Sequence, residues 1–220
     1  MRLTTLAFAA ALALGLAGCS TPGTTQAPAA PATTASATAQ TAPKLHAAMR
    51  SLWHGHIVAT RDYALAVHAG KSANAQQAEA AAIDNAKQIA SAVAGFYGQA
   101  GGDGILKLLG GHWGGVKALT LAAQGSNAAA EQKAMDNLAV NAGQIAKFLA
   151  GANPANWTES ALDGALLMHV GDHKQQVDAM MANAPAAQQA QLWTDMQHHM
   201  DMIADALSDG IAKQFPAKVS

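Results

Sequence analysis

From Lys44 to Ser220, apolar residues recur at intervals of three and four positions, and runs of β-branched residues are absent. This spacing places apolar side chains on one face of an α-helix, whereas strands alternate with a period of two. Alanine, leucine, glutamine and methionine, which favour helices, dominate this part of the chain. The sequence therefore predicts an all-α domain whose length suits one compact core.

Glycines and capping residues divide this domain into six predicted helices. We place them at about residues 44–69, 74–98, 103–124, 127–150, 157–182 and 185–213. The predicted stops are Gly70, Gly101-Gly102, Gly125 and Gly151, and the predicted starts are Asn74, Asp103, Asn127, Asn156 with Glu159, and Pro185. Short connections make neighbouring helices antiparallel. We expect an up-down antiparallel helical bundle of about six helices, built from three repeated helical hairpins.

The three hairpins also resemble one another in sequence. Residues 85–90 (NAKQIA) are repeated at 141–146 (NAGQIA) and, more loosely, at 199–204 (HMDMIA). On the preceding helix of each hairpin a histidine recurs at almost the same interval, at His56, His112 and His169. One hairpin is therefore the repeating unit.

Polar residues interrupt the apolar stripes at corresponding positions. We expect a polar layer at mid-height in the bundle, made of His56, His112, His169, His199, Asn85 and Asn141. Three interpretations of this layer stay open: a network whose side chains satisfy one another, a ligand site, and a pH-responsive core.

A ligand site would use the histidine rings, because neutral imidazole is the commonest protein ligand for several transition metals. Its candidate ligands are His56, His112, His169, His173 and His199, and its candidate cofactors are a transition metal ion or a non-covalent haem. His173 follows His169 by one helical turn, so both rings can face one ion. The nearby methionines either supply soft thioethers or only fill the core. Covalent haem is excluded because no CxxCH motif exists.

Four glycines surround His112 in the sequence Gly110-Gly111-His112-Trp113-Gly114-Gly115. Each glycine lowers helix propensity by roughly 1 kcal/mol relative to alanine, so a compensating feature is expected. Either a neighbouring helix packs very closely here, or the missing side chains leave room for a ligand beside His112.

The amino terminus carries an export signal. Arg2 precedes an apolar run from Leu6 to Leu16, which is too short to span a membrane comfortably. The following Leu16-Ala17-Gly18-Cys19 resembles the bacterial lipobox. By that resemblance residues 1–18 are a cleaved lipoprotein signal peptide, and Cys19 is acylated and becomes the first mature residue. Ser20 favours the outer membrane facing the periplasm.

Residues 19–43 then form a tether rich in alanine, threonine and proline that cannot bury a core, and residues 44–220 form the bundle. Since Cys19 is the only cysteine, acylation leaves no thiol for a disulfide or a thiolate metal site.

The bundle resembles a known family. The patterns are LWxxHxxxTR from Leu52 to Arg61, NAxxIAxFL from Asn141 to Leu149, and ADxxxxGIxxQFP from Ala204 to Pro216. Together they resemble an uncharacterised family of small bacterial all-helical proteins over about residues 45–216. The resemblance implies the helical fold and adds no activity.

Two functions are compatible with these observations. The first is a membrane-anchored cell-envelope lipoprotein that presents a helical bundle as a binding or structural module, without enzymatic activity and with an envelope protein as partner. The alternative is periplasmic binding of copper, zinc or haem through the histidine layer. A weaker third hypothesis places Arg61, His56 and Asp62 at a catalytic cleft. A net charge of −1, with 12% charged residues, argues against a nucleic-acid partner.

Overall fold

The computed structural model describes residues 42–219, which are almost entirely helical and contain no strand. The helices are α1 (Pro43–His68), α2 (Ser72–Gln124), α3 (Ala128–Ala152), α4 (Glu159–Met181), α5 (Ala186–Gln214) and the short α6 (Pro216–Val219). The all-α prediction is confirmed. The predicted signal peptide, Cys19 and most of the predicted tether lie outside the described residues.

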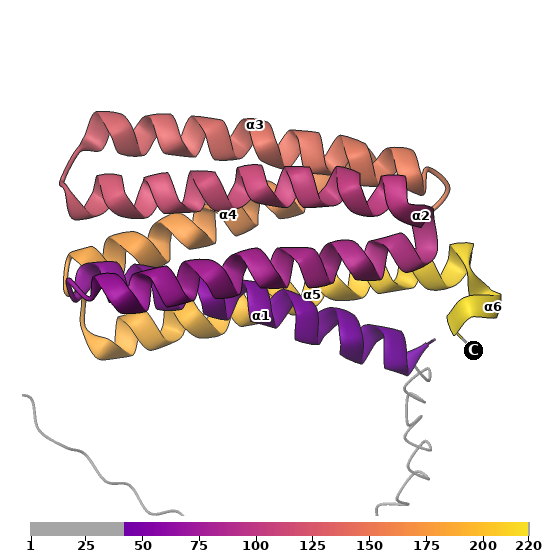
Figure 1. Ribbon diagram of the computed structural model, residues 1–220, viewed down its shortest axis with the longest axis horizontal. Helices are drawn as coiled ribbons and strands as arrows, with labels where there is room; N and C mark the ends of the chain where they lie inside the picture. The colour runs from indigo at the N-terminus through magenta and orange to yellow at the C-terminus, as the bar shows by residue number, and fades with distance from the viewer. Residues whose placement is uncertain (1–41, 220) are drawn as a thin grey trace, which may run out of the picture. The chain divides into compact units, whose positions relative to one another are not determined.

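The longest helix, α2, contains two of the predicted helices and reverses direction at Gly98 (Figure 1). Gly98 has φ 75° and ψ 174°, a conformation that residues with a side chain rarely adopt. Past the reversal, a Cβ atom on Gly102 would lie 2.8 Å from the carbonyl oxygen of Ala90. The two arms of α2, residues 72–97 and 99–124, can therefore fold back on each other only because glycine occupies these positions.

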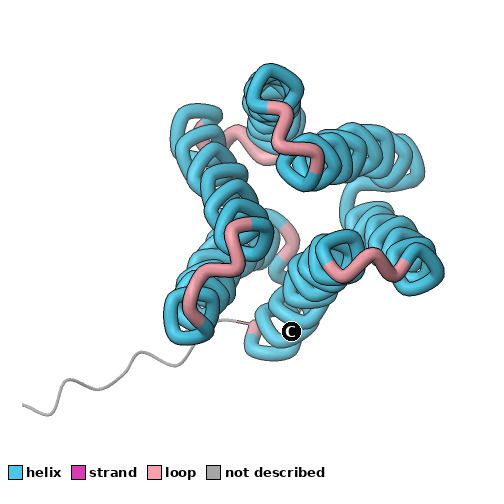
Figure 2. Tube along the Cα trace, turned by 90° about the vertical axis from the view of Figure 1, so that its left-hand side faces the viewer, coloured by secondary structure: helices cyan, strands magenta, loops and turns pink. Residues whose placement is uncertain are grey.

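With α2 counted as two arms, six long helical segments pair into three antiparallel hairpins. These are α1 with the first arm of α2, the second arm of α2 with α3, and α4 with α5. Viewed along the helices, the hairpins surround a common centre, and α5 returns to pack against α1 (Figure 2). The predicted bundle of three helical hairpins is confirmed.

Several predicted helix ends were displaced. The break in α2 falls at Gly98 and not at Gly101-Gly102, so Asp103 is not a cap. Ser72 begins α2, with Lys71 and not Asn74 at the N-cap. Thr158 caps α4 in place of Asn156, because its Oγ1 accepts a hydrogen bond from the amide of Ala161. Thr158 lies one residue before the helix, which is where a side-chain oxygen reaches the free amides of the first turn.

Other predicted ends were confirmed. Asn127 caps α3 by accepting from the amide of Ala130, Gly125 is the C-cap of α2, and Pro185 directly precedes α5. Gly70, with φ 66°, follows the end of α1. Gly151 lies inside α3, one residue before its end.

The glycines around His112 allow close helix packing. A Cβ atom on Gly115 would lie 2.6 Å from Cδ2 of Leu138, and one on Gly111 would lie 3.0 Å from Nδ2 of Asn141. Both neighbours belong to α3. Gly110 and Gly114 have no neighbouring atom within 4 Å of such a Cβ. Of the two explanations for this segment, close packing of α3 against α2 is therefore the one with structural support.

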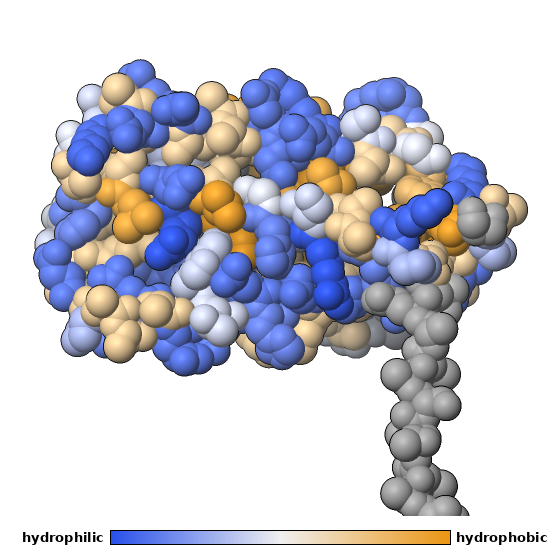
Figure 3. All heavy atoms as spheres, turned by 90° about the horizontal axis from the view of Figure 1, so that it is seen from below, coloured by the Kyte–Doolittle hydropathy of each residue, from blue (hydrophilic) through white to orange (hydrophobic). Residues whose placement is uncertain are grey.

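The apolar stripes of all five long helices meet in one core, with Ile57, Leu119, Leu138 and Met196 fully buried. On the face shown in Figure 3, hydrophobic residues form separate small patches among hydrophilic ones. None of the described helices combines the length and the hydropathy needed to cross a membrane.

Candidate metal centre

Four histidines from three helical segments meet in the core. His56 comes from α1, His112 from the second arm of α2, and His169 and His173 from α4. One ring nitrogen from each lies within 4.8 Å of the corresponding nitrogens of the others. Each residue is only 3–7% exposed. We call these four residues the histidine cluster.

The fold brings the cluster together through its three hairpins. His56, His112 and His169 occupy equivalent positions on the first helix of each hairpin, so the repeat carries them to the common centre. Their ring centroids are 5.4–5.6 Å apart, and the rings of His112 and His169 are stacked with an angle of 19°. His173 adds a fourth ring one turn further along α4.

The closest approach in the cluster joins the two histidines of α4. Nε2 of His169 lies 3.1 Å from Nε2 of His173. Two neutral rings can share only one hydrogen bond in this contact, in which one nitrogen donates and the other accepts. Their ring centroids are 4.4 Å apart.

Burial keeps the cluster uncharged at neutral pH. Desolvation lowers the pKa of His56 to about 3, with a smaller effect from His112, and lowers the pKa of His112 to about 4. Desolvation also lowers the pKa values of His169 and His173 well below 6.5, and the neighbouring histidines lower them further. An imidazole ring must be deprotonated to bind a metal, so all four rings are in the form that binds metals.

Two ring nitrogens in the cluster are buried without a hydrogen-bond partner among residues 42–219. They are Nε2 of His112 and Nδ1 of His169. A buried polar atom that lacks a partner costs roughly 1–3 kcal/mol, so such atoms commonly mark a ligand, an ion or a water molecule.

The two asparagines of the predicted polar layer do not bond the histidines. Asn85 donates from Nδ2 to the carbonyl of Leu52 at 2.9 Å, and Asn141 donates to that of Leu108 at 3.1 Å. Each bond spans 33 residues and joins the two helices of one hairpin. The two bonds therefore occupy the same position in two successive hairpins. The expected network of mutually bonded histidines and asparagines therefore does not form among the described residues, because both amides turn to the backbone.

His199 lies beside the cluster and is not one of its four members. Its Nδ1 is 2.7 Å from Oδ2 of Asp172, and its ring centroid is 6.5 Å from that of His169. The third hairpin therefore differs from the other two, because a histidine bonded to a carboxylate replaces the asparagine bonded to a backbone carbonyl. Asp172 was not among the residues predicted from the sequence, although its place three residues after His169 on α4 was a usable signal.

The three residues of the catalytic hypothesis lie in different surroundings. The guanidinium of Arg61 lies 4.6 Å from the ring centre of Trp193, and Asp62 is exposed. His56 belongs to the buried cluster, whereas Arg61 is half-buried. Met196 and Met200 are buried in the main core, which is consistent with packing, while Met168 and Met202 are exposed.

Comparison of the chain with protein-family models, with curated proteins and with solved structures gives no match. The resemblance to the family of small bacterial helical proteins therefore remains a prediction.

Proposed function

We propose that this protein is a cell-envelope lipoprotein whose helical bundle binds one transition metal ion through His56, His112, His169 and His173. The observation that carries the proposal is the convergence of four buried ring nitrogens within 4.8 Å of one another. The single activity that suits such a site is binding, because four protein ligands fill a tetrahedral ion and leave no open position for a substrate.

The distances fit a small ion after modest adjustment. Zinc–nitrogen bonds of 2.0–2.1 Å place the ligand nitrogens of a tetrahedral site about 3.4 Å apart. The contact of 3.1 Å between His169 and His173 is already close to this separation. The widest pairs, at up to 4.8 Å, need to approach by up to about 1.4 Å. Rotation of the rings of His56 and His112 can provide this.

The donor set restricts the choice of ion. Imidazole nitrogen suits zinc and copper, while magnesium and calcium require oxygen ligands. The cluster contains no carboxylate to balance the charge of a bound ion. Since a single positive charge costs less to bury than two, Cu(I) is a candidate beside Zn(II).

The site suits an ion better than a haem. The four ring centroids lie 4.4–5.7 Å apart, and a porphyrin inserted among them would have to push the three hairpins apart. The self-satisfied network is also disfavoured, because Nε2 of His112 is buried without a partner among the described residues.

The membrane anchor is supported by the lipobox-like sequence Leu16-Ala17-Gly18-Cys19. An acylated Cys19 would hold the bundle at the outer membrane, facing the periplasm, with the membrane as its constant partner. Fractionation of cells that produce the full chain tests this part of the proposal. The native chain should sediment with the membranes, and the Cys19→Ser variant should not.

The metal proposal is tested on residues 39–220. These residues form one compact unit that contains the whole described core. A domain that has its own hydrophobic core can fold on its own. The unit is stripped with a chelator and titrated with Zn(II), Cu(I) and Co(II), and bound metal is measured by mass spectrometry. We expect one equivalent of metal and, with Co(II), the intense visible absorption of a tetrahedral site.

Replacing His169 and His173 together by phenylalanine should abolish metal binding while keeping aromatic rings in the core. The matched control is His198→Gln, because His198 is exposed and adjacent in sequence to the buried His199. A native unit that binds none of the three metals would refute the proposal and leave a structural or partner-binding module.

A further inference from the structure

A second site lies between α4 and α5. It is a cavity of about 340 Å³ that also reaches α1, through Trp53, and α3, through Ile145 and Leu149. Packed protein interiors rarely contain voids much larger than a water molecule, which occupies about 30 Å³. The volume falls within the range of pockets that hold small organic ligands.

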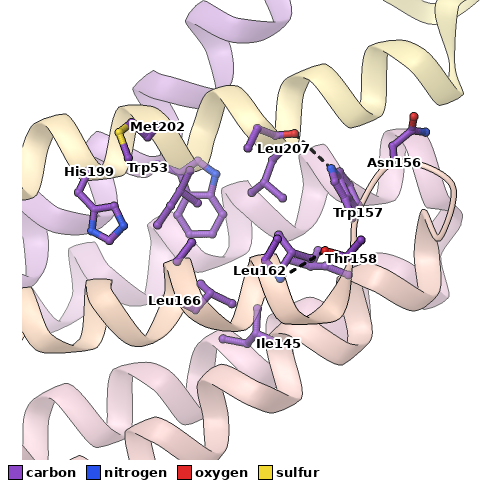
Figure 4. Close-up of a pocket in the computed structure, with 15 residues that line it drawn as sticks. Trp53, Ile145, Asn156, Trp157, Thr158, Leu162, Leu166, His199, Met202 and Leu207 are labelled. Carbon is purple, nitrogen blue, oxygen red and sulfur yellow. Dashed lines mark hydrogen bonds between the residues drawn. The ribbon is translucent and has the colours of Figure 1, made fainter.

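The walls of the cavity are mainly apolar and carry no aspartate, glutamate, lysine or arginine. Figure 4 shows Trp53 and His199 near one end of the cavity, and Asn156 and Thr158 at the other. A charged ligand would lose its hydration here without meeting an ionised lysine or arginine. The cavity therefore suits a neutral molecule.

Most polar groups of the walls are already paired. Nε1 of Trp157 donates to the carbonyl of Ala206 at 3.2 Å, and Nδ2 of Asn156 donates to Oδ1 of Asn153 at 2.7 Å. Thr158 accepts from a backbone amide at the start of α4.

The exception is the indole nitrogen of Trp53. Trp53 is 7% exposed, and its Nε1 is buried without a hydrogen-bond partner among the described residues. An indole N–H can only donate. A ligand beside this ring would therefore gain from carrying one hydrogen-bond acceptor.

We propose that this cavity binds a neutral, mainly apolar molecule that carries one hydrogen-bond acceptor, with the acceptor facing the indole N–H of Trp53. A small ketone or ester with an aliphatic or aromatic body has this chemistry. The site is separate from the metal centre, since none of the four clustered histidines lines the cavity. Two of its wall residues neighbour the cluster: the ring centroid of Trp53 is 6.1 Å from that of His56, and that of His199 is 6.5 Å from that of His169. Ligand binding here does not depend on a bound metal.

The test uses two neutral probes of similar shape, acetylnaphthalene, which is a ketone, and ethylnaphthalene, which is the matched hydrocarbon. Isothermal titration calorimetry on the unit of residues 39–220 should show binding of both, with the ketone about tenfold tighter because it pairs a buried donor. Trp53→Phe should remove this preference and retain hydrocarbon binding. The control is Trp193→Phe, because Trp193 is not part of the cavity wall.

A second variant tests the location without removing a polar group. Ala165 is half-buried and lines the cavity from α4, so Ala165→Phe should fill the space and weaken both probes at least tenfold. His112→Leu should leave both affinities unchanged, which separates this site from the metal centre. Failure of both probes to bind the native unit, or binding that Ala165→Phe does not weaken, would overturn the proposal. Equal affinities for the two probes would overturn the role of Trp53.

Discussion

Nε2 of His169 and Nε2 of His173 lie 3.1 Å apart in the core, one helical turn from each other on α4. The helix itself sets this spacing, so α4 supplies half of the proposed metal site before any other helix packs against it. His56 and His112 then complete the site from the other two hairpins. The cluster is therefore asymmetric in a bundle built from three similar units.

His112→Leu separates metal binding from stability. Nε2 of His112 is buried without a partner among the described residues, so leucine removes a polar atom that no described residue satisfies. We expect the metal-free variant to be about 1 kcal/mol more stable than the native unit, and to lose the rise in melting temperature that Zn(II) causes in the native unit. Urea denaturation measures the stability of the metal-free proteins, and thermal denaturation with and without zinc measures the change in melting temperature. Strong destabilisation of the metal-free variant would instead mean that the ring serves the fold.

The metal-free unit should become less stable as the pH decreases. The pKa of His56 is about 3 and that of His112 about 4 in the folded state, because burial disfavours their charged forms. An unfolded chain titrates these rings near 6.5. Below that pH the unfolded state binds more protons than the folded state, so the free energy of unfolding falls as the pH decreases from about 6.5 towards 4.

Urea denaturation at several pH values between 7.5 and 4.5 measures this dependence. Carboxylates also contribute to acid denaturation, so the informative comparison is with the double variant His56→Leu/His112→Leu. Its stability should depend less steeply on pH between 6.5 and 4.5. Identical slopes for the two proteins would contradict the lowered pKa values.

The sequence predicted the helices well because their apolar spacing is continuous and their connections are short. It failed at the reversal of α2, where three glycines lie within five residues and only packing decides which one bends. Gly98 takes the positive φ, while Gly102 is needed for close approach to Ala90. Neither role is visible in local sequence.

The candidate site was predicted as a set of residues and not as an arrangement. The repeat located His56, His112 and His169, and the one-turn spacing added His173. The same periodicity placed His199 and the two asparagines in the layer, but it cannot show to which partner a side chain turns. Asn85 and Asn141 bond backbone carbonyls, and His199 bonds Asp172.

A row of hydrogen-bonded polar pairs joins α1 to α5 and closes the bundle. His46, Arg50 and His54 are spaced one turn apart on α1, and they face Asp209, Asp205 and Asp201 on α5. Asp205 is central, because it accepts from Arg50 through both oxygens and lies 2.9 Å from Nδ1 of the buried His46. The hydrogen bonds from Arg50 hold the pKa of Asp205 below its usual value.

Asp205→Asn should therefore destabilise the unit by about 1–2 kcal/mol, since it removes charge-assisted hydrogen bonds. Asp84→Asn is the matched control, because its ion pair with Lys87 is exposed, and such pairs contribute less than about 0.5 kcal/mol. Chemical denaturation at neutral pH compares the two variants. Equal effects would show that the row contributes nothing beyond ordinary surface pairs.

The adjacent glycines Gly114 and Gly115 should respond in opposite directions to the same substitution. Both lie in the second arm of α2, where alanine has the higher helix propensity by roughly 1 kcal/mol. A Cβ atom on Gly114 meets no atom within 4 Å, so Gly114→Ala should stabilise the unit by up to about 1 kcal/mol.

A Cβ atom on Gly115 would lie 2.6 Å from Cδ2 and 2.7 Å from Cγ of Leu138. Leu138 is fully buried on α3. Gly115→Ala should therefore destabilise the unit by about 1–3 kcal/mol, despite the gain in propensity. If urea denaturation shows that both alanines stabilise, α3 does not pack as closely on α2 as the structure places it.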